Sequence, residues 1–126
     1  MQAELISISN TLTTAAAAQL GCGAGNTVFP LLEANPQAYV YACDFAPRAV
    51  RLVQAHPSYK EGRVHAFVAD ITRPGALAGP VPAGMVDTCM LVFVLSAVTP
   101  EKMPQVLFTL ACALRKVGCL HCMHAA

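Results

Sequence analysis

Short apolar segments alternate with segments of helical character along most of the chain. Four continuous apolar runs of strand length occupy Ala15 to Leu20, Ala38 to Cys43, Val64 to Val68 and Val86 to Val94. Such runs are typical of strands buried on both faces of a sheet, and a final apolar stretch, Cys119 to Met123, predicts one more strand. The alanines of the first run also suit a helix, so a helical alternative stays open there.

Three helices are expected between these runs. Thr27 to Glu33 is short because Pro30 is tolerated only in a first turn, and Pro47 opens a second helix over about Arg48 to Ala55. Pro100 opens a third helix, predicted to close at Arg115-Lys116, with apolar positions spaced three and four residues apart. Strands that alternate with helices in this way indicate an α/β fold with about four or five parallel strands.

Composition indicates a single domain with an unusually apolar surface. The 126 residues form one domain of ordinary size, 56% of them are hydrophobic and only 12% are charged. Because polar groups are scarce, exposed apolar surface is expected. No apolar run is long enough to span a membrane, and Met1 to Ala18 has no positively charged leader, so no membrane association is expected.

The six cysteines indicate the redox state of the compartment in which the chain is expected. Most of them lie inside apolar segments, where a free thiol behaves as a small hydrophobic group. A reducing compartment fits best, and a cytoplasmic location is expected, with the mitochondrion and the nucleus left open.

Net charge gives no general attraction to nucleic acid, because the chain carries only +1. Four basic residues do lie close together in sequence: Arg48, Arg51, Lys60 and Arg63. We interpret them as a solvated helix face in preference to an RNA-binding patch.

Three features fall at predicted carboxyl ends of strands, where open parallel sheets bind ligands. Glycines at 21, 23 and 25 allow a sharp turn and close backbone approach to a ligand, while Asp44 and Asp70 each follow a strand. Asp44 is placed to accept hydrogen bonds from ribose hydroxyls. Two structural alternatives remain: a tight turn without a ligand, and a helix cap at Asp44.

Other nucleotide-binding patterns fit less well. The dinucleotide pattern G-x-G-x-x-G requires glycine at position 26, where this chain has Asn26, and no G-x-x-x-x-G-K-[ST] motif occurs. A dinucleotide-dependent oxidoreductase is therefore a weaker hypothesis.

Longer strings around these features resemble one family. The segments Gly21-Cys22-Gly23-Ala24-Gly25-Asn26-Thr27-Val28-Phe29-Pro30-Leu31-Leu32-Glu33, Tyr41-Ala42-Cys43-Asp44-Phe45, Pro47-Arg48-Ala49 and Leu91-Val92-Phe93-Val94-Leu95-Ser96-Ala97 are similar to the methyltransferase-like tRNA 3-methylcytidine methyltransferases. The match runs from about Leu20 to Lys116. It implies a Rossmann-like class I methyltransferase sheet that is incomplete at its C-terminus.

The resemblance also implies a cofactor, a substrate and site residues. S-adenosylmethionine would lie with its amino-acid part against Gly21, its ribose on Asp44 and its adenine amine on Asp70, while Leu91 lines the adenine or sulfonium side. The cofactor-binding set implied by the family comprises Gly21, Gly23, Asn26, Asp44, Phe45, Asp70, Ile71 and Leu91. The methyl acceptor would be N3 of a cytidine in the tRNA anticodon loop, and because that nitrogen has its own lone pair, no catalytic acid or base is assigned.

The chain departs from the family in several places. Gln19 replaces an acid that precedes the glycine loop, which predicts weaker binding of the cofactor's ammonium group. Met1 to Ala18 does not resemble the family's N-terminal lid, and the later substrate-facing strands are absent after Lys116-Val117-Gly118-Cys119. We therefore expect a truncated form, in which a protein partner could supply the missing surface, and an inactive or regulatory fragment is the alternative hypothesis. The tail residues Cys119, His121, Cys122 and His124 follow no structural zinc spacing, so no metal site is assigned.

Overall fold

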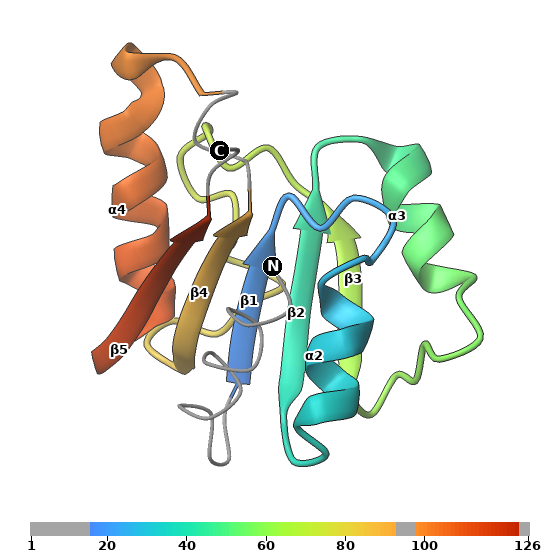
Figure 1. Ribbon diagram of the computed structural model, residues 1–126. Helices are drawn as coiled ribbons and strands as arrows, with labels where there is room; N and C mark the ends of the chain where they lie inside the picture. The colour runs from blue at the N-terminus through green and yellow to red at the C-terminus, as the bar shows by residue number, and fades with distance from the viewer. Residues whose placement is uncertain (1–15, 93–97, 124–126) are drawn as a thin grey trace.

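A five-stranded parallel sheet forms the centre of the molecule in the computed structural model, which describes residues 16–92 and 98–123. The strands follow the order β3-β2-β1-β4-β5, so the chain begins in the middle of the sheet and builds outward in both directions (Figure 1). Their bounds are β1 Ala16–Leu20, β2 Tyr39–Asp44, β3 Val64–Val68, β4 Val86–Val92 and β5 Leu114–Met123. The predicted α/β class and parallel sheet are confirmed.

The register brings the carboxyl ends of the central strands to one edge. Leu20, the last residue of β1, pairs with Cys43 of β2 on one side and with Leu91 of β4 on the other. Asp44 of β2 in turn pairs with Val68 of β3. The segments that follow β1, β2 and β3 therefore start from the same edge of the sheet.

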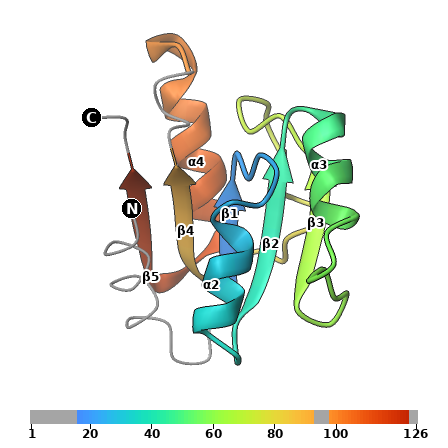
Figure 2. The same cartoon turned by 45° about the vertical axis from the view of Figure 1, so that its right-hand side comes forward.

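Helices cover both faces of the sheet (Figure 2). Helices α2 (Val28–Ala34) and α3 (Pro47–Gln54) pack over one face, and α4 (Met103–Ala113) packs over the other. The core under α2 and α3 includes Val28, Leu31, Val40, Val50, Val53 and Val64, and the core under α4 includes Leu20, Cys43, Val86, Leu91, Val106 and Leu110. This three-layer arrangement follows from strands that are apolar on both faces, because each face needs its own cover.

Two helices begin at prolines, as predicted. Pro47 occupies the first turn of α3, and Pro100 opens a 3₁₀ turn, Pro100–Lys102, that leads into α4. Proline suits these positions because its fixed φ is helical and its missing N–H would have no intrahelical partner there. Between residues 69 and 85 the chain forms turns and bends, in agreement with its glycine and proline content.

The predicted end of the third helix is wrong. Arg115 and Lys116 lie in β5, because α4 ends at Ala113 and Leu114 is already extended, with φ −72° and ψ 140°. Leu114 pairs with Val86 of β4, and Arg115 forms an ion pair with Asp87. Strand pairing with β4 therefore ends the helix at Ala113, before the basic residues, which local sequence signals could not indicate.

The basic residues expected to form one solvated face do not all do so. Arg48 and Arg51 are exposed on α3 and Lys60 is exposed in the following loop, but Arg63 is half-buried. Its guanidinium donates to the carbonyl oxygens of Leu32 (2.9 Å), Asn35 (2.8 Å) and Ala38 (3.4 Å). Arg63 thus satisfies carbonyl groups at and beyond the end of α2, where helices leave acceptors without intrahelical donors.

Apolar side chains remain exposed, as the composition predicts. Leu107 and Phe108 of α4 are 45% and 65% exposed. Among the cysteines whose side chains the structure describes, Cys22, Cys43, Cys89 and Cys112 are all free thiols. No helix in the described ranges is long and apolar enough to cross a membrane.

Candidate functional site

The glycine loop turns sharply away from β1. Gly21, Gly23 and Gly25 have φ values of 73°, 54° and 94°, in the left-handed region that favours glycine. The N–H groups of Gly21 and Cys22 both donate to the carbonyl oxygen of Cys43, each at 2.9 Å, which ties the start of the loop to β2. The loop therefore has one defined path from β1 to α2.

The last two glycines of the loop, Gly23 and Gly25, have different surroundings. A Cβ atom added at Gly25 would lie 2.5 Å from Cε2 of Phe29, whereas one added at Gly23 would have no atom within 4 Å. Gly25 is thus required for packing against α2. Gly23 instead borders open space, into which a ligand can approach the backbone.

Asp44 links the glycine loop to the start of α3. Its Oδ2 accepts the N–H of Gly23 and its Oδ1 accepts the N–H of Ala46, both at 2.9 Å. Ala46 is the N-cap residue of α3, so Asp44 precedes the N-cap and does not itself cap the helix. Because an ionised carboxylate has about four lone-pair positions, both oxygens can accept further hydrogen bonds.

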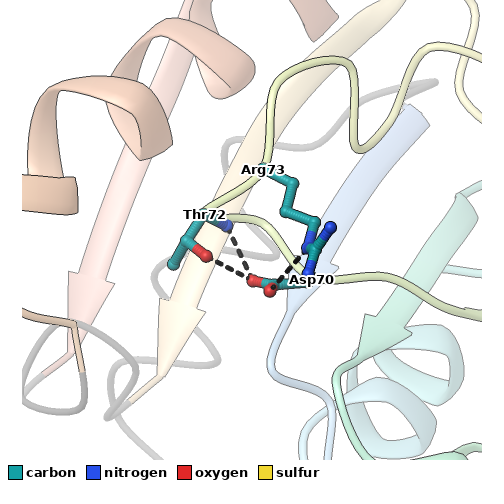
Figure 3. Close-up of polar contacts among 3 residues, drawn as sticks. All are labelled: Asp70, Thr72 and Arg73. Carbon is teal, nitrogen blue, oxygen red and sulfur yellow. Dashed lines mark hydrogen bonds and ion pairs between the residues drawn. The ribbon is translucent and has the colours of Figure 1, made fainter.

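Asp70 is held by a local turn just after β3 (Figure 3). Its Oδ1 accepts the N–H of Thr72 at 3.0 Å and the Thr72 hydroxyl at 2.6 Å, while Nε of Arg73 lies 3.5 Å from Oδ2. These hydrogen bonds, with the Arg73 charge as a smaller contribution, lower the pKa of Asp70. Asp70 is therefore an ionised acceptor at neutral pH.

Thr72 and Arg73 were not among the predicted site residues. An aspartate followed two residues later by threonine is typical of a turn in which the carboxylate bonds the backbone, so the spacing Asp70-Ile71-Thr72 carried a usable signal. The approach of Arg73 depends on how its long side chain folds back, which the sequence does not specify.

The remaining predicted cofactor residues occupy three kinds of environment. Phe45 is 73% exposed beside Asp44. Ile71 and Leu91 are buried in the core under α4. Asn26 is exposed and lines a hollow of about 760 Å³ between α2 and the segment after α3, which Asp44 and Asp70 do not line. The structure thus brings Gly23 and Asp44 into direct contact, and Asn26 lines a hollow that neither acid lines.

The thiol of the loop is not a candidate nucleophile. Burial raises the pKa of Cys22 to about 12, and the nearby negative charge of Asp44 adds to the effect. A cysteine reacts as its thiolate, so Cys22 is inert near neutral pH. Its place in the loop is explained by packing.

Gln19 is a buried polar residue just before the loop. Its side chain is 1% exposed, and its Oε1 has no hydrogen-bond partner within the part of the chain that the structure describes. A carbonyl oxygen left in this state is destabilising unless a donor reaches it.

These groups fit a ligand that combines a nucleoside with a small polar end. Two carboxylates can accept from hydroxyl and amine groups, Gly23 borders open space, and a buried oxygen without a donor lies next to the loop. The described side chains place no general acid or base with an evident role among them.

Comparisons with known proteins agree with this arrangement. Residues 18–120 match a family model described as a methyltransferase domain. The tRNA N(3)-cytidine methyltransferase METTL6 of Homo sapiens is 49% identical over 89 residues, which cover 71% of this chain and 31% of that protein. The mitochondrial tRNA N(3)-cytidine methyltransferase METTL8 of Mus musculus is 47% identical over 87 residues, covering 67% and 31%.

A solved structure shares the fold. The S-adenosylmethionine-dependent methyltransferase of Mesorhizobium loti superposes with a TM-score of 0.72 at 18% identity, covering 90% of this chain and 47% of that one. The solved structure confirms the Rossmann-like sheet, and the family model with the curated relatives confirms the resemblance drawn from the sequence strings. The chain spans about a third of the length of the curated relatives, 31% in both cases.

Proposed function

This chain belongs to the methyltransferase domain family, and we propose that the crevice beyond β1, β2 and β3 binds S-adenosylmethionine. The observation that carries the proposal is the hydrogen bond between the N–H of Gly23 and Oδ2 of Asp44. This bond holds the glycine loop against the acid at the end of β2, so one ligand can contact both.

Each group has a proposed role toward the cofactor. Asp44 accepts the ribose hydroxyls through its free lone pairs, and Asp70, held ionised by Thr72, accepts the adenine amine. The backbone of Gly21 and Gly23 lies along the amino-acid part. Phe45, Ile71 and Leu91 contribute apolar contact near the adenosine, and Asn26 contributes at the helix side of the loop.

We propose that the methyl acceptor is N3 of a cytidine in the tRNA anticodon loop. Support comes from the curated relatives, which are named as tRNA N(3)-cytidine methyltransferases. When bound, S-adenosylmethionine supplies an electrophilic methyl group. The acceptor nitrogen has its own lone pair, so the chain's residues need only hold and orient the reactants and exclude water, without a strong base.

The transfer itself can be tested with labelled cofactor. The purified chain would be incubated with methyl-labelled S-adenosylmethionine and with tRNA that lacks 3-methylcytidine. We expect label at N3 of one anticodon-loop cytidine, and none in a tRNA with that cytidine replaced by uridine. Absence of label in a chain that binds S-adenosylhomocysteine would instead support a non-catalytic, regulatory role.

We also propose a domain organisation, a compartment and a protein-binding surface for the chain. We treat residues 1–126 as one domain with a family-like core over about residues 20–116. Within the described residues, the cysteines with a described side chain are free thiols, which supports a reducing compartment. We place the chain in the cytoplasm, with the mitochondrion and the nucleus as alternatives. The exposed Leu107 and Phe108 side chains support a protein partner on the outer side of α4.

A further inference from the structure

Neither acid of the proposed cofactor site lines the hollow of about 760 Å³ between α2 and the segment after α3. Its volume lies within the range of roughly 300–1,000 Å³ that is typical of small-molecule sites. Its wall combines aromatic rings with charged side chains: Phe29 and His56 supply the rings, and Lys60, Arg63 and Glu33 supply the charges. Because the cations outnumber the anion, the hollow attracts anionic ligands.

The two rings form a packed wall of the hollow. Phe29 and His56 are stacked, with their ring centroids 3.8 Å apart and an angle of 14° between the ring planes. Phe29 is buried against Gly25, where an added Cβ would lie 2.5 Å from its Cε2. His56 is half-buried, so the imidazole is the accessible ring of the pair. An aromatic ring in a positively charged hollow suits a planar ligand group such as a nucleobase.

The segment after α3 also sets the hydrogen-bonding state of the imidazole. Nδ1 of His56 accepts the N–H of Ser58 at 3.0 Å. A nitrogen that accepts a hydrogen bond carries no proton, so the proton of the neutral ring lies on Nε2. The imidazole therefore offers a ligand both a ring and an N–H donor.

Arg63 adds a positive charge in a defined position. Its Nε and Nη2 donate to the carbonyl oxygens of Leu32, Asn35 and Ala38. Nη1 takes part in none of these three bonds, so its N–H groups are the ones suited to contact a ligand. Lys60, which is exposed, adds an ammonium group to the same hollow. Guanidinium and ammonium groups are common partners of phosphate oxygens.

We propose that this hollow binds a nucleotide, with the phosphate near Lys60 and Arg63 and the base against the His56 ring. A nucleotide matches both features of the wall, because it carries an anionic group and a planar ring. Glu33 repels the phosphate and limits the affinity. The nucleotide is either free in solution or part of an RNA strand, and the inference does not depend on the cofactor site.

Uridine 5′-monophosphate is a suitable probe, because it has no adenine to enter the cofactor crevice. Its Kd and those of uridine and inorganic phosphate would be measured by calorimetry, with S-adenosylhomocysteine in excess. A fluorescein-labelled uridine oligonucleotide, followed by fluorescence anisotropy in the same buffer, represents an RNA strand. We expect the monophosphate to bind at least about tenfold more tightly than uridine or phosphate alone, because ring and phosphate contacts both contribute.

Substitutions separate the hollow from the general surface charge. Lys60→Glu should weaken binding of uridine 5′-monophosphate about tenfold and Glu33→Gln should tighten it about threefold, because each changes a charge beside the phosphate. Arg51→Glu is the matched control, since it alters the net charge equally but Arg51 is exposed on α3 and does not line the hollow. Salt screens such a charge, so a change below about twofold is expected. His56→Leu should weaken the monophosphate about tenfold and inorganic phosphate less than about threefold, because base stacking is lost.

The outcomes distinguish the two sources of the nucleotide and decide the inference. Tighter binding of the oligonucleotide than of the monophosphate, weakened by Lys60→Glu, would support an RNA strand as the occupant, and the reverse order would support a free nucleotide. Binding of neither by the folded, unmodified chain would overturn the inference, as would equal weakening by Lys60→Glu and Arg51→Glu. Urea unfolding checks the fold of each variant, and if His56→Leu does not fold, the exposed Lys60 and Glu33 variants decide.

Discussion

Two regions of the sheet differ in how their structure is specified. Around β1 and β2, backbone and side-chain hydrogen bonds join the glycine loop, Cys43 and Asp44, and each bond lies between residues that the sequence singles out. Around β4 and β5, the ladder has an irregularity between Val86 and Thr88, and α4 leaves Leu107 and Phe108 exposed. The first region is specified by local residues, and the second by pairing with neighbouring elements.

This difference explains where the proposed function resides. A ligand site needs groups that nearby parts of the fold hold in place. The glycine loop and Asp44 meet this condition, because residues 21–44 are joined by hydrogen bonds to one another. The α4 side carries apolar surface, and the only residues of its core assigned to the site are Ile71 and Leu91, which contribute apolar contact. Substitutions in the two regions should therefore have effects of very different size.

The largest effect is expected at Gly25. Gly25→Ala places a Cβ atom 2.5 Å from Cε2 of Phe29 and requires an alanine with φ of 94°. Overpacking and backbone strain together should lower the free energy of unfolding by about 3 kcal/mol. Urea unfolding measures the change, with Gly23→Ala as the control, since its Cβ would meet no atom within 4 Å and only the strain, about 1 kcal/mol, applies. Equal losses in the two variants would show that packing against α2 does not matter.

A smaller effect is expected at Arg63. Arg63→Met removes three hydrogen bonds from a cationic donor to the carbonyl oxygens of Leu32, Asn35 and Ala38. The free energy of unfolding should fall by about 2 kcal/mol. Arg48→Met removes an exposed charge from α3 and should change it by less than about 0.5 kcal/mol. Equal changes in the free energy of unfolding for the two variants would show that Arg63 is solvated and that its hydrogen bonds do not stabilise the fold.

Alkaline pH should weaken the fold through its buried thiols. Burial raises the pKa of Cys22, Cys43 and Cys89 to about 12 in the folded chain. The unfolded chain loses these protons near pH 8.5. The stabilisation that the buried, protonated thiols give the folded chain is therefore complete below that pH and is lost as the pH rises toward about 12. Between pH 8.5 and 9.5, each thiol should lower the free energy of unfolding by about 1.4 kcal/mol or less. Unfolding of Cys43→Ala and of the unmodified chain across this range tests the prediction, and parallel slopes would contradict it.

The smallest effect is expected at the β4–β5 side. Arg115→Ala removes the ion pair with Asp87, but the Arg115 side chain is 51% exposed and solvent screens the pair. A loss of about 0.5 kcal/mol or less is expected in urea unfolding, similar to that of Lys102→Ala. A loss above about 2 kcal/mol would mean that β5 depends on this pair, and the contrast between the two regions would fail.

The sequence predicts most of this fold because its strands are continuous apolar runs bounded by glycine, proline and aspartate. The bounds of β3 were predicted residue for residue, and Pro47 correctly indicated the start of α3. The end of α4 was missed because strand pairing between Leu114 and Val86, 28 positions apart in sequence, overrides the basic residues that would suit a helix end.

The candidate site was predictable in part for the same reason. Asp44 and Gly23 belong to local motifs at strand ends, and the sheet brings them together. The buried state of Gln19 and the capping role of Arg63 depend on side-chain packing across several elements, which periodicity does not encode. That Asn26 lines a hollow which Asp44 does not line is likewise a property of the folded turn.

The central claim is that Asp44 and the glycine loop together bind S-adenosylmethionine. Its most direct test is calorimetric titration of S-adenosylhomocysteine into the unmodified chain and into Asp44→Asn, with folding of both checked by urea unfolding. We expect saturable binding to the unmodified chain and at least about tenfold weaker binding to Asp44→Asn, because a carboxylate acceptor is lost. No binding to the folded, unmodified chain, or equal Kd values for the two proteins, would contradict it.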